Sequence, residues 1–184
     1  MTTGHGENRI LCSACEKGHL AEKVVKHDVG ALVGMSSVMV ENLPALVCSN
    51  CGAVTVRGNT LDAVTYLLAA LILKRSVLDA IEVRYLRGLL GDTQEELAKS
   101  LDVDRATVNR WENSTTPITG TQAYAIRTHA FFRLRDKSPA VDAASGAFVY
   151  REGPNPRAAL VRKPMPHSKR TGYQLDAAAF AASP

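Results

Sequence analysis

The spacing of apolar residues predicts that the middle of the chain is helical. Between residues 59 and 135, apolar side chains recur every three or four positions, which is typical of helices that bury one face. We expect a helix over 59–77, a second with Val77, Ile81, Tyr85 and Leu89 inward that ends near Gly88 or Gly91, and a last one over Thr121–Arg135. Asn59 and Thr60 are the expected cap of the first helix.

Polar capping residues divide the stretch between these helices into two short ones. Thr93 and Glu96 have the spacing of a capping box, so a helix begins at Gln94. Asp104 is placed to cap a second helix over Arg105–Glu112. Asp102 lies in the turn between them, where Asp is one of the few residues that tolerate a left-handed backbone.

The first part of the chain has a different pattern. β-Branched residues over Leu20–Val29, Ser37–Val47 and Val54–Val56, with Gly30 and Gly34 between the first two runs, predict short strands and a turn. The fold class is therefore α+β. We expect a β-rich module at 1–58, a connecting helix at 59–77, an all-α unit at 78–137 and, because Gly and Pro interrupt any regular pattern, a flexible tail at 138–184 with a short helix at Leu175–Ala182.

Charge and hydropathy narrow the class of protein. The net charge of +4 is uneven: residues 78–136 hold eight Lys or Arg against nine Asp or Glu, and residues 139–184 hold six against three. The tail is thus expected to add non-specific affinity for polyanions, and not to be needed for folding. The apolar stretch at 63–73 is too short to span a bilayer, and the polar start at 1–8 does not resemble a signal peptide. These features indicate a cytoplasmic protein without a membrane partner.

The cysteines carry the clearest chemical signal in the sequence. They form two Cys-x-x-Cys pairs, Cys12/Cys15 and Cys48/Cys51, and no other cysteine is present. Two such loops complete a tetrahedral sulfur site, the closed geometry of one structural zinc ion, Zn2+, per chain. An iron site of the same geometry remains open, and four unrelated thiols or two disulfides are the competing interpretations. His5, His19 and His27 are poor ligand candidates because four cysteines already fill the site.

Residues 94–112 have the pattern of a helix-turn-helix, with Leu97, Val103, Val108 and Trp111 as its small core. In this motif the second helix enters the major groove of double-stranded DNA. The stretches at 93–98 and 107–113 closely resemble the Xre/Cro/repressor family. That resemblance implies that Gln94 binds a phosphate and that the reading positions are Arg105, Ala106, Thr107, Asn109 and Arg110. His129 on the last helix is expected to be a packed residue.

The pairing of the two modules resembles the MqsA antitoxin family, which has a YgiT-type zinc finger. The matching features are Cys12/Cys15, the stretch from Leu43 to Gly52, and Tyr85-Leu86-Arg87 before Thr93, and they lie within residues 10–135. The resemblance implies a homodimeric repressor of its own promoter that neutralises an RNA-cleaving toxin. A zinc-containing regulator without a toxin is the alternative.

Catalysis is not expected. No catalytic residues are assigned, since the sequence offers no nucleophile–base pair, phosphate loop or paired acids. A dithiol enzyme is the remaining enzymatic hypothesis, and it would need one exposed Cys-x-x-Cys pair rather than two that converge on one ion.

Overall fold

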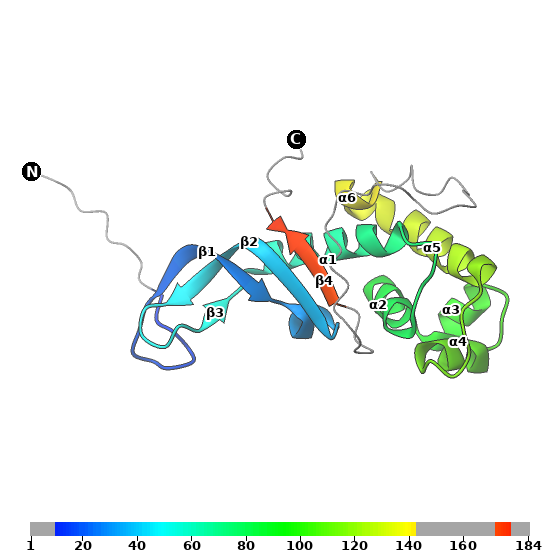
Figure 1. Ribbon diagram of the computed structural model, residues 1–184, viewed down its shortest axis with the longest axis horizontal. Coiled ribbons are helices and arrows are strands. Elements are labelled where there is room, and N and C mark those ends of the chain that lie inside the picture. The colour runs from blue at the N-terminus through cyan, green and yellow to red at the C-terminus, as the bar shows by residue number, and fades with distance from the viewer. Residues whose placement is uncertain (1–9, 143–171, 178–184) are drawn as a thin grey trace, which may run out of the picture.

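The computed structural model of the protein describes residues 10–142 and 172–177. Within these residues, a four-stranded sheet lies at one end, a group of helices lies at the other, and α1 runs between them (Figure 1). The elements are β1 (Leu20–Asp28), η1 (Gly30–Val33), β2 (Ser37–Cys48), β3 (Val54–Thr55), α1 (Gly58–Leu73), α2 (Ala80–Leu90), α3 (Gln94–Ser100), α4 (Arg105–Glu112), α5 (Gly120–Leu134), η2 (Arg135–Lys137), α6 (Pro139–Asp142) and β4 (Gly172–Asp176). The α+β prediction is confirmed.

The sheet is built around β2. β1 pairs with it antiparallel from Leu20 opposite Cys48 to Asp28 opposite Met39, with one irregularity between Val25 and His27. Since β1 covers one edge, β3 and β4 share the other: β3 pairs with Leu46 and Val47, and β4 runs parallel to residues 37–41. The predicted turn is present as η1, which ends at Gly34 with a φ of 74°.

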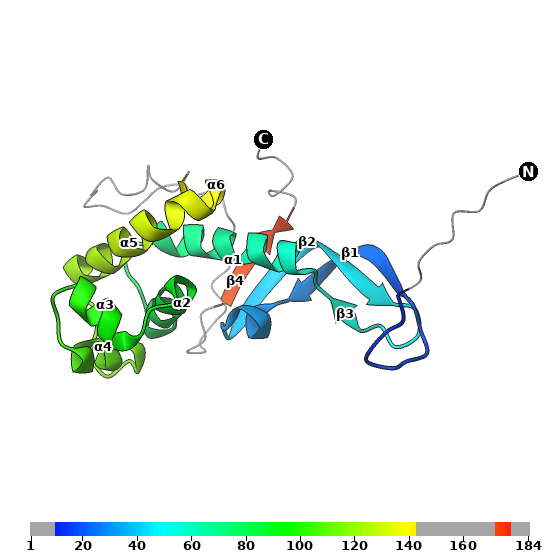
Figure 2. The ribbon, with the colours of Figure 1, turned by 180° about the vertical axis from the view of Figure 1, so that it is seen from behind.

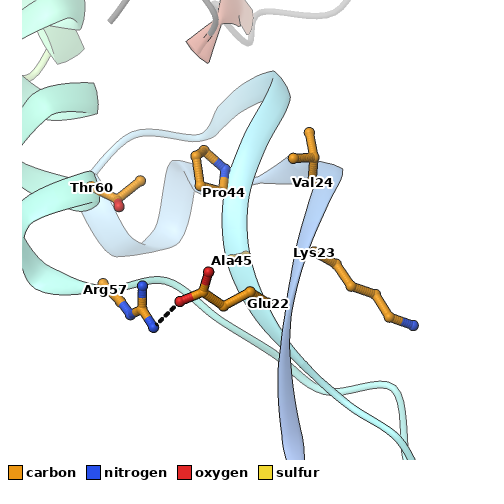
Figure 3. Close-up of a pocket in the computed structure, with 7 residues that line it drawn as sticks. All are labelled: Glu22, Lys23, Val24, Pro44, Ala45, Arg57 and Thr60. Carbon is orange, nitrogen blue, oxygen red and sulfur yellow. Dashed lines mark hydrogen bonds and ion pairs between the residues drawn. The ribbon is translucent and has the colours of Figure 1, made fainter. Parts of the chain in front are cut away.

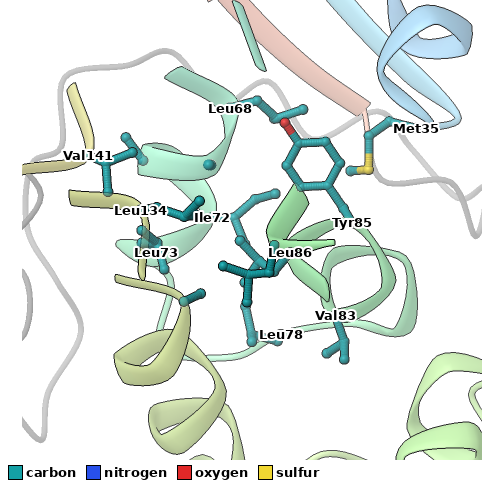
Figure 4. Packing of buried hydrophobic residues seen from close by; sticks show 14 of the residues in the cluster. Met35, Leu68, Ile72, Leu73, Leu78, Val83, Tyr85, Leu86, Leu134 and Val141 are labelled. Atoms are coloured by element: carbon teal, nitrogen blue, oxygen red, sulfur yellow. The ribbon is translucent and has the colours of Figure 1, made fainter. Parts of the chain in front are cut away.

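The helix α1 joins the sheet to the other helices through one continuous apolar core. Its Val64 and Leu68 are fully buried in the same cluster as Leu43 of β2. Figure 4 shows Leu68, Ile72 and Leu73 of α1 near Tyr85 and Leu86 of α2 and Leu134 of α5. The Tyr85 hydroxyl also donates to the carbonyl of Thr65 at 2.7 Å. The predicted helix at 59–77 is thus a packing helix, and it is shorter than expected.

Two local details of the helix starts differ from the sequence prediction. The cap of α1 is Arg57, not Asn59 or Thr60, and Arg57 makes no side-chain capping bond. The helix α2 begins after Asp79, which forms a capping box with Glu82, so Val77 lies before the helix and is 60% exposed. Of the predicted inward residues, Tyr85 is buried and Ile81 and Leu89 are partly buried against the core. The buried face also includes Val83, Leu86 and Leu90, so it is wider than the sequence predicts.

The predicted flexible tail is wrong where the structure describes it. The helix α6 packs against α1, and β4 is a hydrogen-bonded strand instead of the beginning of a helix at Leu175. Leu175 is 1% exposed and belongs to the main core, so this part of the tail is packed into the fold. The predicted short helix extends beyond residue 177, and that part of the prediction, together with residues 143–171, lies outside the described residues.

Figure 2 shows the molecule from behind, where α1 lies in front of the sheet and runs alongside α5. None of the helices in the described part of the chain has the length and apolar character needed to cross a membrane.

Candidate metal centre and nucleic-acid interface

The fold brings all four cysteines together at the end of the sheet. The sulfur atoms of Cys12, Cys15, Cys48 and Cys51 all lie within 4.8 Å of one another. Two of the separations are 3.8 Å, for Cys12 and Cys51, and 3.7 Å, for Cys15 and Cys48. A tetrahedron with metal–sulfur bonds of about 2.3 Å has edges of about 3.8 Å. The four sulfur atoms therefore fit a tetrahedral metal ion, and the cysteines are free of disulfides.

Backbone turns hold the sulfur atoms in this arrangement. In the first loop, the Cys12 N–H donates to the carbonyl of Gly18 at 2.9 Å, and Glu16 has a φ of 53°. In the second, the N–H groups of Asn50 and Cys51 point at the Cys48 sulfur at 3.3 and 3.5 Å. The Asn50 side chain, which cysteine spacing does not single out, donates to Cys15 Sγ at 3.6 Å. Such donors stabilise thiolates, the form that binds metal.

The electrostatics of the cluster favour a cation between the thiolates. Hydrogen bonds from the backbone at Gly18 and Lys17 lower the pKa of Cys15 to about 6, and those from Cys51 and Asn50 lower the pKa of Cys48. The backbone of Ala53 lowers the pKa of Cys51, but its contacts with the Cys48 and Cys15 thiols raise it overall to about 11. Four thiolates at this spacing repel one another, so a positive ion is needed to ionise all four.

Gly18 is a further requirement of the site that cysteine spacing does not reveal. A Cβ atom at this position would lie 2.5 Å from Cys48 Sγ and 2.8 Å from the Asn50 backbone nitrogen. Only glycine lets the two loops approach this closely.

We expect Gly18→Ala to weaken metal binding by roughly ten- to hundredfold, the range seen when groups that position ligands are changed. Metal affinity, measured by competition with a chromogenic chelator, checks this. Gly58→Ala is the matched control, because a Cβ there meets nothing within 4 Å. Equal affinities of the two variants would contradict the role of Gly18.

The helices α3 and α4 form the predicted helix-turn-helix. Thr93 and Glu96 make the capping box, with both bonds present, and the Asp104 side chain accepts from the Thr107 N–H at 2.7 Å. Asp102 has a φ of 54°, which confirms the expected left-handed turn. Leu97, Val108 and Trp111 are buried at 2% exposure or less, and Val103 packs against them half-buried.

The outer face of α4 is polar and accessible. Arg105, Ala106, Asn109 and Arg110 are exposed, and Thr107 is half-buried. The Thr107 hydroxyl accepts from Arg110 Nη2 at 2.7 Å and lies 3.1 Å from Asp104, so the capping aspartate indirectly orients the arginine. This face can present bidentate donors and acceptors to base edges in a major groove.

A buried ionic cluster fixes α4 against α2 and α3. Glu112 is 4% exposed and accepts from Arg87 Nε at 2.5 Å and from Gln94 Nε2 at 2.8 Å. Burial would raise the pKa of Glu112, but the hydrogen bonds from Arg87 and Gln94 lower it below its usual value. The pattern of apolar and capping residues gives no sign of this cluster.

Gln94 therefore has a structural role, because its amide binds Glu112. The sequence predicts a phosphate contact for the same residue. Its carbonyl oxygen lies 3.5 Å from Asn109 Nδ2, so it also touches the reading helix. The phosphate role of Gln94 stays a prediction.

The histidines of the described residues are not members of the cysteine cluster. Among the described residues, the group that could hold a metal consists of the four cysteines alone, without His19 or His27. His129 is half-buried, as expected of a packed residue, and lies 3.4 Å from the buried carboxylate of Asp92. His5 lies outside the described residues.

A shallow pocket lies beside the sheet, between β1, β2 and the start of α1 (Figure 3). Its lining consists of Glu22, Lys23, Val24, Pro44, Ala45, Arg57 and Thr60. Two of its charged groups are taken up by the ion pair between Arg57 and Glu22.

Comparison with known families identifies the helical unit. The model of the helix-turn-helix family matches residues 83–128, from within α2 to within α5. A comparison with curated proteins finds no significant match. Together with the exposed face of α4, the match supports a DNA-binding transcriptional regulator whose residues 83–128 form a helix-turn-helix. The matched stretch does not extend to the cysteine module, so membership of the MqsA family is not shown.

Proposed function

We propose that the protein is a sequence-specific transcriptional repressor that binds operator DNA through α4 and is stabilised by a zinc ion at the four cysteines. The observation that carries the proposal is the outer face of α4, where Arg105, Asn109 and Arg110 are all exposed on a helix that Glu112 anchors from behind. Arg reads guanine and Asn reads adenine by paired hydrogen bonds.

The proposed zinc site is structural. Four thiolates complete a tetrahedral ion and leave no position for a reactive water, so the metal stabilises the loops at 12–18 and 48–53 instead of catalysing a reaction. This closed arrangement supports the proposal that the protein is not an enzyme. Reduced thiols that bind a metal also favour a cytoplasmic location.

The proposal includes a homodimer. A single α4 of eight residues reaches only a few base pairs, and helix-turn-helix repressors gain specificity by placing two reading helices about one turn of DNA apart. The operator is then a palindrome with half-sites about 34–36 Å apart.

The further role as an antitoxin rests on the resemblance of the cysteine spacing and the helix-turn-helix to the MqsA family. In this proposal the zinc module binds a protein toxin and the helical unit represses the shared operon. Purification from the native host separates the two roles: capture of a small RNase encoded beside this gene supports the antitoxin, and an intact repressor that captures none supports the stand-alone regulator.

We expect Arg110→Ala to cost about 1–3 kcal/mol of binding free energy at the cognate operator, because a bidentate base contact is lost. The preference among sequences should relax at the matching base pair. Fluorescence anisotropy with the promoter of the protein's own gene, and with variants at each base pair, measures both effects.

Arg135→Ala is the matched control for this experiment, because Arg135 is a 44% exposed arginine outside the reading helix. Unchanged operator affinity in Arg110→Ala would remove Arg110 from base reading.

A further inference from the structure

One edge of β2 is covered by a segment from the far end of the sequence. Residues 37–41 pair in parallel with residues 172–176, from Ser37 opposite Gly172 to Glu41 opposite Asp176 (Figure 1). The neighbouring strand β3 covers only Leu46 and Val47 of the same edge. The backbone N–H and C=O groups of residues 37–41 on this edge can therefore pair with one further strand, and that strand is β4.

Alternate side chains of this segment enter the protein. Leu175 is 1% exposed and Ala177 is 5% exposed, and both belong to the main apolar cluster together with Val38 and Val40 of β2. Gln174, which precedes Leu175, is exposed. The period of two is that of a strand which lays one face on a core and the other in water.

The third inward residue, Tyr173, forms hydrogen bonds with a buried ion pair, Glu82 and Arg75. The Tyr173 hydroxyl donates to Glu82 Oε1 and accepts from Arg75 Nη1, the latter at 3.0 Å. Glu82 is fully buried, forms an ion pair with Arg75, and accepts the Asp79 N–H at 2.9 Å through its other oxygen. A carboxylate at zero exposure needs all of these donors, so this position selects a phenol over a plain aromatic ring.

The exposed side chains on and around β4 form hydrogen bonds that contribute less to stability than the buried contacts. Gln174 donates to Glu41 at 2.7 Å and Asn42 donates to Asp176 at 2.9 Å, and all four side chains lie in contact with solvent. Exposed polar pairs contribute little net free energy. Recognition therefore depends on the backbone ladder and on Tyr173, Leu175 and Ala177.

We propose that the β2 edge, α1 and the start of α2 form a peptide-acceptor groove for an extended Tyr-x-Leu-x-Ala segment, and that residues 172–177 of this chain are its ligand. Strand addition of this kind takes affinity from main-chain hydrogen bonds and specificity from pockets for alternate side chains. The groove joins the sheet that carries the cysteines to α2 of the DNA-binding unit, so the bound segment ties these two parts together.

The test uses the full chain with a protease recognition site inserted between Pro154 and Asn155. The chain folds intact and is then cut, and gel filtration shows whether the C-terminal fragment stays bound. A labelled synthetic peptide of residues 170–184 is then exchanged into the cut protein and followed by fluorescence anisotropy. Substitutions are placed in the peptide, so that the folding of the acceptor is not affected.

We expect the fragment to stay bound and the peptide to exchange with it. The Tyr173→Phe peptide should bind about tenfold or more weakly, because a bond to a buried charge is lost. The Leu175→Ala peptide should bind roughly thirtyfold or more weakly, since it leaves a cavity. The Gln174→Ala peptide, as the matched control, should stay within about threefold of the wild-type sequence.

Two results would overturn the proposal. One is that the fragment separates on gel filtration, the cut protein keeps the unfolding midpoint of the intact protein and the peptide does not bind. The other is that all four peptides, together with a scrambled sequence, bind equally well.

Discussion

Cys48→Ser is expected to abolish stable metal binding and to disorder the loops at 10–19 and 48–53. Cys48 is 3% exposed, and its sulfur accepts two backbone N–H groups and lies 3.7 Å from that of Cys15. Complete zinc sites of small domains contribute about 10–16 kcal/mol of binding free energy, and that free energy stabilises the fold, so losing the metal should unfold these loops. Metal content by elemental analysis and hydrogen exchange of the backbone amides measure the two effects.

The structure also limits how far this disorder spreads. Cys48 lies at the end of β2 that pairs with the start of β1, whereas Val38, Val40 and Leu43 lie earlier in β2 and belong to the core that includes α1. We therefore expect α2 to α5 to keep their protection in Cys48→Ser. Ser13→Ala, which changes an exposed neighbour of Cys12, should behave like the wild type. Full metal occupancy and normal stability in Cys48→Ser would refute the four-sulfur site.

Glu112→Ala is expected to destabilise the helix-turn-helix by about 3–5 kcal/mol, the range for breaking a buried ion pair from one side. Arg87 would keep its charge inside the protein without the carboxylate, and the Gln94 amide would lose its acceptor. Because α2, α3 and α4 meet at this cluster, operator binding should fail together with thermal stability. Urea denaturation followed by circular dichroism gives the free energy of unfolding.

Glu95→Ala is the matched control for this prediction. Glu95 is also an acid of the motif, but it is 61% exposed and pairs with Lys99 along the same helix. Its loss should cost no more than about 0.5 kcal/mol. A cost below about 1 kcal/mol for Glu112→Ala would show that Arg87 and Gln94 find other partners.

Features that depend on local sequence are predictable here. The capping residues Thr93 and Asp104, the left-handed Asp102 and the two Cys-x-x-Cys loops each need only a few neighbouring residues, and all are present. The spacing of the cysteines identifies four ligand candidates because the backbone turn between each pair is short.

Features that depend on distant partners are not predictable from the same patterns. Glu112 and Glu82 have the appearance of surface acids in the sequence, and their burial depends on Arg87, Arg75 and Tyr173. The strand β4 has five residues, which is too short for alternation to stand out, and its pairing partner β2 lies far earlier in the chain, at residues 37–41. The start of α2 could be predicted from Asp79 and Glu82, which have the spacing of a capping box.

The late position of β4 sets the order of events during synthesis. The edge of β2 at residues 37–41 emerges early, but its partner is made only when residues 172–176 are translated. At roughly 5–20 residues per second, synthesis of residues 42–176 takes about 7–27 s. Throughout that time the helix-turn-helix can fold while an unpaired strand edge faces other nascent chains, which is the condition that favours edge-to-edge aggregation. The codons for residues 172–176 therefore determine how much of the newly made protein avoids aggregation, and chains that stop before residue 172 keep this edge of β2 unpaired.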